Sequence, residues 1–363
     1  MNNILVVCQT PYQIIVASKI VETFYSKDQV DIVITNNING GEKLVERIKL
    51  SNLFHDAFYI KTRRLRILNQ IDPLINYINK KYQVYKELKS TIQNKKYNKL
   101  VFCNIDVTVQ HIANIANRFA PIDLVLFEDG LSSYRKNFGH TFENYVQKKS
   151  IKNKIKYGIL RSHFSRISEF YVFNPNYLEW IPTFSVVKIP NICREDQGLI
   201  SELNEIFMYD DLKDEYDFKY IFFEESYFAD GYKVNDIELV KKIADIVGKN
   251  NILVKIHPRN QENRFREQGY RTNRITSIPW EIIALNMHLK NKVLITIASG
   301  SVMHPTIIMN EEIRAVMLFK LQELDAELIE DLIDVIENIC KRNRDKYFIP
   351  QNIDELNSLL KSL

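Results

Sequence analysis

Short apolar runs alternate along the chain with segments in which apolar residues recur every three or four positions. In the first half, the runs with the length and the Val, Ile and Leu content of buried strands are residues 3–9, 30–36, 99–104, 122–130, 169–174 and 185–190. Helical periodicity covers residues 12–24, 41–51, 66–95 and 107–119. Strands that alternate with helices in this way predict parallel βαβ units covered on both faces.

A second series of the same kind begins after residue 216. Its expected strands are residues 219–226, 251–258, 292–299 and 313–319. Its expected helices are residues 235–247, 279–290, 301–309, 323–342 and 352–362. The intervening segment 191–216 has no clear strand and carries an acidic cluster, so we interpret it as a connector. The chain thus predicts two doubly wound α/β domains, 1–190 and 217–350, with a closing helix in 351–363.

Composition places the chain among ordinary globular proteins. Hydrophobic residues make up 45% and charged residues 26% of the sequence, which argues against a disordered chain. The four cysteines lie far apart without CxxC spacing, so neither a disulfide framework nor a cysteine metal site is expected. The apolar N-terminal run is too short for a signal peptide, and no stretch approaches the roughly 20 apolar residues that cross a bilayer. We therefore expect a cytoplasmic protein.

Basic residues gather in two stretches of a chain whose net charge is +4. Residues 148–166 are rich in Lys and Arg and contain no acidic residue, and a second group lies at 61–66. Two interpretations stay open: solvated helix faces, and attraction of 148–166 to an anionic glycan or to the inner membrane at about 1 kcal/mol per basic residue. Nucleic acid is not expected as a partner, because no zinc-ligand spacing or RNA-binding aromatic motif accompanies the charge.

Three polar segments stand where strands are expected to end, which is where ligands bind in doubly wound sheets. Residues 127–130 read Phe-Glu-Asp-Gly, residues 255–259 read Lys-Ile-His-Pro-Arg, and residues 298–302 read Ala-Ser-Gly-Ser-Val at an expected helix start. Hydroxyls and free N–H groups at a helix start favour anions, a histidine can act as an acid, and a carboxylate can act as a base. Alone, each segment is typical of a turn, a loop or an N-cap, but together they favour a catalytic site.

These segments resemble the acidic-acidic-Gly motif (127–130), the His-Pro motif (255–259) and the Ser motif (298–302) of bacterial sialyltransferases and polysialyltransferases. Residues 8–21 and 277–283 are similar to glycosyltransferase family 52, which includes lipooligosaccharide and capsule sialyltransferases. The resemblance implies a GT-B fold, in which two Rossmann-like domains face a cleft, with the acceptor on the N-terminal side and the nucleotide sugar on the C-terminal side. It also implies an inverting, metal-independent transfer of sialic acid from CMP-sialic acid to a galactose-type acceptor on a capsule or lipooligosaccharide.

The resemblance assigns the donor site to the second domain. His257 would protonate or hydrogen-bond the departing phosphate, and Arg259 would support that phosphate or hold the loop. Glu281 would accept hydrogen bonds from the ribose hydroxyls, and Trp280 would shape the cytosine pocket, with a place in the core as its alternative. The full expected donor-binding set is Pro258, Arg259, Pro279, Trp280, Glu281, Ser299, Gly300 and Ser301, of which the last three would bind the phosphate.

The general base stays open among five carboxylates. In family 52 the base lies just after the first strand of the second domain, where this chain offers Glu224, Glu225 and Asp230. Related families use the acidic-acidic-Gly motif, here Glu128 and Asp129. We favour Asp230, although the common Gln-Pro pair of family 52 is replaced here by Glu225-Ser226.

Two further segments complete the expectations for the site. The residues that open the first expected helix would contact the acceptor, and they are Thr10, Pro11, Tyr12 and Gln13. A second His-Pro pair at 304–305 lies inside an expected helix rather than at a strand end, so we assign it no role.

Other functions remain open from the sequence. The same fold would serve a hexosyltransferase that uses a UDP-sugar, a non-catalytic sugar-nucleotide-binding assembly protein, or a sugar-nucleotide epimerase. We expect no cofactor and no metal ion, because no carboxylate pair stands in the context of a metal-holding DxD site. A homodimer is left open.

Overall fold

The computed structural model describes residues 1–61, 82, 85–92, 94–117, 121–140, 167–322 and 326–363. The basic stretch 148–166 and most of the helical region expected at 66–95 lie outside these residues. The chain divides into two compact units. Unit 1 is Met1–Pro190 with Gln197–Ile206, and unit 2 is Asn191–Asp196 with Phe207–Leu363.

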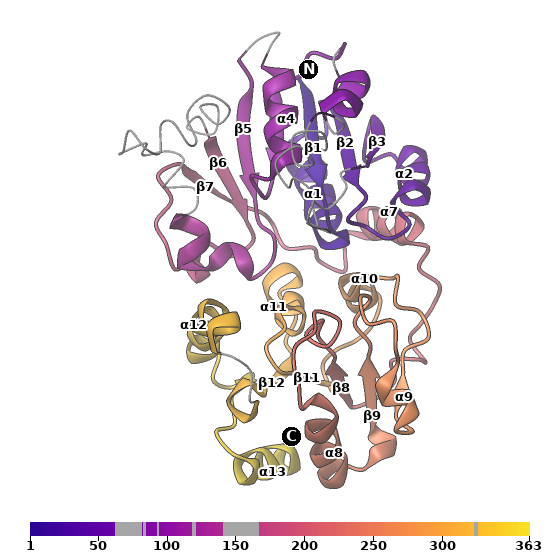
Figure 1. Ribbon diagram of the computed structural model, residues 1–363, viewed down its shortest axis with the longest axis vertical. Helices are drawn as coiled ribbons and strands as arrows, with labels where there is room; N and C mark the ends of the chain where they lie inside the picture. Colours follow the sequence, from indigo (N-terminus) through magenta and orange to yellow (C-terminus); the bar gives the residue numbers. More distant parts are fainter. Residues whose placement is uncertain (62–81, 83–84, 93, 118–120, 141–166, 323–325) are drawn as a thin grey trace, which may run out of the picture. The chain divides into compact units, whose positions relative to one another are not determined.

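Unit 1 is built on a sheet of seven parallel strands in the order β3-β2-β1-β4-β5-β6-β7 (Figure 1). They are β1 (Asn3–Cys8), β2 (Gln29–Thr35), β3 (Asp56–Ile60), β4 (Lys99–Phe102), β5 (Asp123–Phe127), β6 (Ile167–Val172) and β7 (Ser185–Lys188). The central strands β1, β4 and β5 are almost wholly buried, as continuous apolar runs in a parallel sheet require. The edge strand β3 has no counterpart among the predicted strands.

The helices of unit 1 connect or flank these strands. They are α1 (Pro11–Phe24), α2 (Gly41–Leu50), α4 (Val107–Ala116) and α7 (Gln197–Phe207), with 3-10 turns η1 (Ser132–Tyr134) and η3 (Pro175–Tyr177). α1 begins where the sequence predicts it, because the Thr10 hydroxyl accepts the Gln13 backbone N–H at 3.2 Å and Pro11 occupies the first turn. α7 lies in the segment interpreted as a connector, yet all but its last residue belongs to unit 1.

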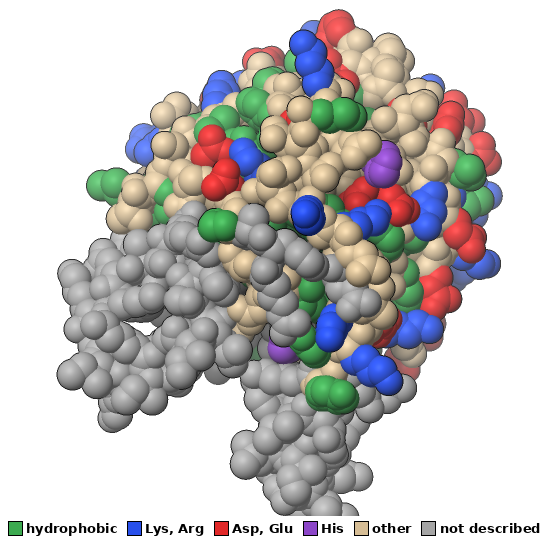
Figure 2. Space-filling view, turned by 90° about the horizontal axis from the view of Figure 1, so that it is seen from above, with side chains coloured by type: hydrophobic (Ala, Val, Ile, Leu, Met, Phe, Trp, Pro, Cys, Tyr) green, Lys and Arg blue, Asp and Glu red, His purple; other side chains and the backbone are tan. Residues whose placement is uncertain are grey.

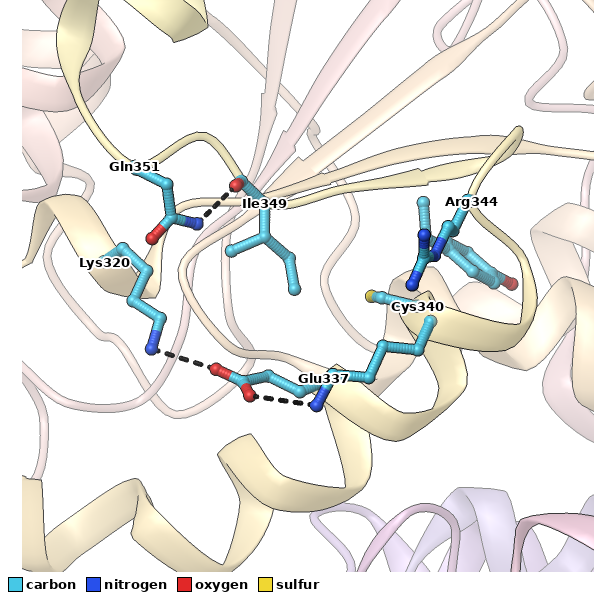
Figure 3. Close-up of a pocket in the computed structure, with 8 residues that line it drawn as sticks. Lys320, Glu337, Cys340, Arg344, Ile349 and Gln351 are labelled. Atoms are coloured by element: carbon cyan, nitrogen blue, oxygen red, sulfur yellow. Dashed lines mark hydrogen bonds and ion pairs between the residues drawn. The ribbon is translucent and has the colours of Figure 1, made fainter.

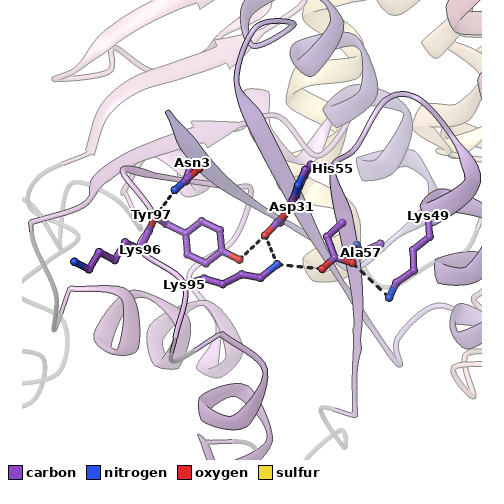
Figure 4. A network of polar contacts seen from close by, with 9 residues as sticks. Asn3, Asp31, Lys49, His55, Ala57, Lys95, Lys96 and Tyr97 are labelled. Atoms are coloured by element: carbon purple, nitrogen blue, oxygen red, sulfur yellow. Dashed lines mark hydrogen bonds and ion pairs between the residues drawn. The ribbon is translucent and has the colours of Figure 1, made fainter. Parts of the chain in front are cut away.

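A buried carboxylate ties β2 to β3 and to the segment before β4 (Figure 4). Asp31 in β2 is 4% exposed and accepts hydrogen bonds from the Tyr97 hydroxyl at 2.7 Å and from Lys95 Nζ at 2.8 Å. Its other oxygen lies 3.0 Å from His55 Nδ1. Lys95 also contacts Asp56, the first residue of β3, at 3.0 Å. These partners replace the hydration that the buried carboxylate loses, so the cluster is structural.

Unit 2 contains a second parallel sheet, with six strands in the order β10-β9-β8-β11-β12-β13. They are β8 (Tyr220–Phe223), β9 (Ile252–Lys255), β10 (Arg271–Thr272), β11 (Val293–Thr296), β12 (Arg314–Met317) and β13 (Tyr347–Phe348). This is the strand order of a Rossmann fold, and its switch point, where the order reverses, lies between β8 and β11. The four central strands were predicted by their apolar runs, whereas the two-residue edge strands β10 and β13 were not.

The helices of unit 2 correct the sequence prediction at two places. They are α8 (Asp236–Val247), α9 (Arg264–Glu267), α10 (Trp280–Leu285), α11 (His304–Met309), α12 (Ala326–Arg342) and α13 (Ile353–Ser362), with 3-10 turns η4 (Lys249–Asn251), η5 (Gly300–Val302) and η6 (Phe319–Leu321). A single helix over 301–309 is wrong, because the ring of Pro305 excludes the carbonyl of Ser301 and a new helix starts there. The helix expected over 279–290 ends at Leu285, where the Asn286 side chain bonds the Ile282 carbonyl at 2.8 Å.

Neither the described helices nor the visible surface adds support for a membrane site. Within the residues described, no helix combines the length and the hydropathy needed to span a bilayer. On the face seen in Figure 2, the described Lys and Arg side chains lie among Asp and Glu side chains rather than in a patch of one sign. Membrane contact through 148–166 therefore stays a prediction.

Candidate active site

The His-Pro and Ser motifs lie at the switch point of the unit 2 sheet. β8 pairs with β9 on one side and with β11 on the other, all in parallel (Figure 1). The loops after these strands therefore leave from the same edge of the sheet, which is where a Rossmann-type sheet binds ligands. Neighbouring strands lie about 4.8 Å apart, so the two motifs, one strand removed from each other, are separated by about 10 Å.

Glu224, the first residue after β8, supports the His-Pro loop from inside. Its side chain is fully buried and accepts the His257 backbone N–H at 3.1 Å and an Arg264 guanidinium N–H at 3.0 Å. Arg264 also pairs with Asp236 at 2.6 Å. Burial raises the pKa of Glu224, and the hydrogen bonds that it accepts offset only part of this effect. Glu224 is thus a structural support for His257.

The His257 side chain is a neutral hydrogen-bond donor. The Arg259 backbone N–H donates to His257 Nδ1 at 3.2 Å, which assigns the ring proton to Nε2. Burial lowers the pKa of His257 to about 4, the positive charges of Lys255 and Arg259 act in the same direction, and Asp230 opposes them. At neutral pH the imidazole therefore offers an Nε2–H and carries no charge.

Three predicted residues come together on the loops after β8 and β9. The Arg259 guanidinium forms an ion pair with Asp230, whose other oxygen accepts the Ser226 hydroxyl at 2.8 Å. Arg259 Nη1 also reaches Ser226 Oγ at 3.3 Å. Because the charge of Asp230 acts on the pKa of His257, all three predicted groups share one neighbourhood. In this arrangement the guanidinium of Arg259 and the carboxylate of Asp230 are each other's ion-pair partners.

The Ser motif leaves β11 as a hydrogen-bonded turn. The Thr296 hydroxyl oxygen accepts the Ser299 N–H at 3.1 Å, and Ser299 Oγ accepts the Ser301 N–H at 3.2 Å. Ser299, Gly300 and Ser301 are all half-buried, and η5 and α11 follow. The sequence predicts that the motif follows a strand, but a 3-10 turn and then α11 take the place of the single expected helix, and the partial exposure of the motif makes it accessible to a ligand.

Glu281 belongs to a buried polar cluster that the sequence did not reveal. It is 6% exposed, and its Oε1 lies 2.5 Å from His304 Nδ1. Burial raises the pKa of Glu281, but the hydrogen bond and charge of His304 and the charge of Lys255 outweigh this, so the pKa is lowered. The second His-Pro pair, to which we assigned no role, thus positions a residue expected to hold the ribose.

The other residues expected near the cytosine differ in burial: Trp280 lies in the core, whereas Pro279 and Pro258 are partly or fully exposed. Trp280 is 3% exposed, and its ring packs edge-on against Phe223 at 4.8 Å and near Tyr216 at 6.1 Å between centroids. This packing supports the core interpretation of Trp280, in place of a pocket role. Pro279, which precedes α10, is half-buried, and Pro258 is exposed.

Glu128 of the acidic-acidic-Gly motif is a buried anchor of unit 1. Its carboxylate is 0% exposed and accepts the Tyr12 hydroxyl at 2.6 Å, the Phe173 N–H at 2.8 Å and the Tyr134 hydroxyl. Burial and the charge of Glu128 raise the pKa of Tyr134 well above its usual value. Tyr12 thereby joins the N-terminal block to this motif. Gln13, 1% exposed, accepts the Gln9 N–H at 2.6 Å and serves the turn.

Asp129 differs from its neighbour in exposure. It follows β5 and is half-buried, with the Asn104 side-chain amide 3.1 Å from Oδ2. Its backbone N–H donates to Ser133 Oγ at 2.6 Å. Gly130 has a φ of 61°, a left-handed conformation that favours glycine, so the turn needs this residue type. The turn thus presents Asp129 at the carboxyl edge of the unit 1 sheet.

A cavity of about 320 Å³ lies beside the carboxyl ends of β12 and β13 (Figure 3). Lys320, Lys341 and Arg344 line it together with Glu337, which pairs with Lys320 at 2.9 Å and with Lys341 at 3.7 Å. None of the residues predicted from the sequence lines this cavity. Among the described residues, no group of three or more His, Cys, Asp or Glu side chains could hold a metal ion.

Solved structures similar over nearly the whole chain have the GT-B architecture. The glycotransferase of kitacinnamycin matches with a TM-score of 0.56 and 9% identity, covering 100% of this chain and 90% of its own. UDP-GlcNAc 2-epimerase from Methanocaldococcus jannaschii gives 0.54 and 14%, covering 99% and 92%. The alpha/beta-galactoside alpha-2,3-sialyltransferase from Photobacterium phosphoreum gives 0.53 and 12%, covering 96% and 98%. At these identities the likeness shows the fold, and it confirms the predicted GT-B-type α/β class.

Comparisons of sequence identify the family. A search of the curated proteins found no significant match. The family model described as alpha-2,8-polysialyltransferase (POLYST) matches residues 4–312, which include the three motifs. This match confirms the predicted resemblance to bacterial sialyltransferases and polysialyltransferases, and with it the prediction of a glycosyltransferase. The chain belongs to the alpha-2,8-polysialyltransferase family.

Proposed function

We propose that this chain moves sialic acid from CMP-sialic acid to a sialic-acid-terminated bacterial surface glycan, by an inverting reaction without a metal ion. The observation that carries the proposal is the geometry of His257: its Nδ1 accepts the Arg259 backbone N–H at 3.2 Å, which leaves the Nε2–H as the donor of the ring, on the loop after β9 at the same sheet edge as the Ser motif after β11. Family membership favours sialyl transfer over the alternatives, of which hexosyl transfer from a UDP-sugar is the nearest.

The leaving group explains why these side chains are needed. The bond from the anomeric carbon to the phosphate oxygen breaks, and CMP departs with the electron pair, so negative charge grows on its phosphate. The Nε2–H of His257 would donate a hydrogen bond to this phosphate and stabilise the growing charge while the proton stays on the ring. The Ser299 and Ser301 hydroxyls and the Gly300 N–H would bind the other phosphate oxygens. Glu281, held by His304, would meet the ribose.

The family description changes the acceptor that we propose. An alpha-2,8 linkage joins a new sialic acid to the O8 of another, so the acceptor of such an enzyme is itself a sialic acid. The sequence analysis expected a galactose-type acceptor instead. Parallel assays with sialic-acid-terminated and galactose-terminated oligosaccharides separate the two, and transfer to galactose alone would contradict the revised acceptor.

We also place the general base at Asp129 rather than at Asp230. A base must reach the acceptor hydroxyl, and Asp129 is half-exposed whereas Glu128 is fully buried. Both oxygens of Asp230 are already engaged, one by the Arg259 guanidinium and the other by the Ser226 hydroxyl. The argument for Asp230 came from family 52, whereas the model that matches is that of the polysialyltransferases, for which the acidic-acidic-Gly motif is the expected source.

Nucleotide binding tests the donor independently of the acceptor. We expect calorimetric titration to give tighter binding of CMP than of UDP or GDP, by about tenfold or more, which corresponds to about 1.4 kcal/mol. The reason is that sialic acid is carried by CMP in the proposed reaction. Tighter binding of UDP would contradict the sialyl proposal and favour the hexosyl alternative.

Activity should survive removal of divalent metal ions. In the proposed reaction the growing phosphate charge is stabilised by the His257 Nε2–H, the Gly300 N–H and the hydroxyls of the Ser motif, so no cation is required. Initial rates measured with and without EDTA should agree within about twofold. Loss of activity in EDTA that magnesium or manganese restores would refute this account of the leaving group.

A further inference from the structure

Glu225, the second residue after β8, is bonded to the base of the Ser motif. Its Oε1 accepts the Thr296 hydroxyl at 2.5 Å and the Ala298 N–H at 2.6 Å. The Thr296 hydroxyl oxygen in turn accepts the Ser299 N–H at 3.1 Å. One carboxyl oxygen thus orders the three positions that lead from β11 into the motif.

The second oxygen of this carboxyl is in a different situation. Glu225 Oε2 is buried and makes no hydrogen bond of ordinary geometry, while the Tyr227 hydroxyl interacts with the carboxyl from the same loop. The groups that face the carboxyl are the Tyr227 hydroxyl from its own loop, and Thr296, Ala298 and Ser299 from the side of β11. None of these four groups carries a charge at neutral pH, since burial and Glu225 itself raise the pKa of Tyr227.

The charged groups of the neighbouring loops are paired with other partners. From the side of β9, Arg259 is held by Asp230. Arg264, on α9, is held by Glu224 and by Asp236. The Glu225 carboxyl is therefore surrounded by neutral donors. Burial raises the pKa of Glu225 from 4.5 to about 7, and the hydrogen bonds offset part of that effect.

The residue type at position 225 matters, because glutamate and glutamine have nearly the same shape and differ in whether the side chain can ionise. A glutamine oxygen would accept the same two hydrogen bonds from Thr296 and Ala298 without ever ionising. The carboxyl therefore adds a proton equilibrium to a hydrogen-bonding role that an amide could fill.

We propose that Glu225 is a positioning residue that orders the Ser motif and couples the binding of an anion there to the uptake of a proton by its own carboxyl. This rests on the proposed function, in which the motif binds the phosphate of the donor. A phosphate at the motif and an ionised Glu225 are like charges close together, so binding favours the neutral carboxyl. The proton comes from solvent to Oε2, while Oε1 goes on accepting from Thr296 and Ala298.

The sign of the effect follows from this coupling. Anion binding moves the midpoint of Glu225 protonation to higher pH, so affinity for the phosphate is greatest where the carboxyl is neutral. Affinity should therefore fall as the pH rises above about 7, by up to about tenfold per pH unit. The pKa of Glu225 is higher in the folded protein than in the unfolded chain. Its contribution to the free energy of unfolding is therefore present below about pH 4.5 and lost by about pH 7.

Calorimetric titration of CMP into the protein and into Glu225→Gln tests the proposal. At about pH 8 the phosphate of free CMP is already fully ionised, so proton uptake reports on the protein. Titrations in two buffers of different ionisation enthalpy should give the wild-type protein at least about half a proton more per CMP than the variant. Glu225→Gln should bind CMP about three- to tenfold more tightly than wild type at about pH 8.5 and equally at about pH 6.

Two variants keep the test decisive. Glu238→Gln removes an exposed carboxyl from α8 of the same unit and should leave both proton uptake and its pH dependence unchanged. Glu225→Ala removes the acceptor as well as the charge, so it should bind CMP more weakly than Glu225→Gln at every pH. Thermal unfolding checks that Glu225→Gln is folded. If it is not, Glu225→Ser, which keeps a neutral hydroxyl at this position, takes its place in the comparison at about pH 8.5.

The outcomes separate this proposal from the function on which it rests. Equal proton uptake and equal pH dependence in wild type and Glu225→Gln would overturn the role of Glu225, while CMP binding itself still supported the donor. Failure of wild-type protein and all variants to bind CMP would instead contradict the proposed function, and the coupling with it.

Discussion

We expect His257→Ala to lower kcat by about 10²- to 10³-fold, the usual cost of removing one hydrogen-bond donor that stabilises charge in the transition state. In the structure the His257 ring is a neutral hydrogen-bond donor through Nε2. This donor would act when the CMP phosphate gains negative charge. Donor affinity should change much less than kcat, because the interaction grows mainly in the transition state. Steady-state rates with CMP-sialic acid, together with CMP titration, measure both quantities.

The same replacement at an exposed histidine of unit 2 provides the control. His288 lies between α10 and β11, on the surface, so His288→Ala should retain its rate. Since the pKa of His257 in the free protein is about 4, protonation of this ring should not reduce kcat/KM between about pH 6 and pH 8. Near-normal turnover of His257→Ala would show that His257 has no catalytic role.

Asp129→Asn should produce a second loss of about 10²- to 10⁴-fold in kcat, again with little change in donor affinity. The acceptor hydroxyl must lose its proton as it attacks, and an amide cannot take that proton. Asp230→Asn should cost less, because this carboxylate is already engaged by Arg259 and Ser226. Rates with saturating donor and a sialic-acid-terminated acceptor give the ranking.

Asp123 offers a matched control for Asp129 on the same strand. It is the exposed first residue of β5, at the opposite end from the motif, so Asp123→Asn should be fully active. Glu128→Gln should lower the melting temperature, because it disturbs a buried carboxylate with three donors. A larger loss in Asp230→Asn, or in a stably folded Glu128→Gln, than in Asp129→Asn would move the base to that residue.

The sequence predicted the strands that are buried on both faces, but of the four edge strands in the two described sheets it predicted only β7 and missed β3, β10 and β13. β1 and β11 are continuous apolar runs, and such runs are recognisable without a partner. β3, β10 and β13 are short or half-exposed, and they exist because a neighbouring strand offers hydrogen bonds. α7 was missed for a related reason, since its residues fall in a polar segment that packs with unit 1.

The motifs could be found from sequence because strand ends in a parallel sheet share one edge. What could not be found were pairings between distant residues, such as Glu281 with His304 or Glu225 with Thr296. Nothing in a single sequence specifies which loop carboxylate turns inward and which outward, so Glu224, Glu128 and Asp129 looked alike as candidates. Burial separates them, and burial is a property of the folded chain.

The most direct test of the central claim is a transfer assay with purified protein, CMP-sialic acid and a short sialic-acid-terminated oligosaccharide, analysed by mass spectrometry. The account predicts that acceptor molecules gain the mass of one or more sialic acids, that CMP appears in equal amount, and that His257→Ala abolishes most of both. Release of CMP without any gain in acceptor mass, or transfer of a hexose from a UDP-sugar under the same conditions, would contradict it.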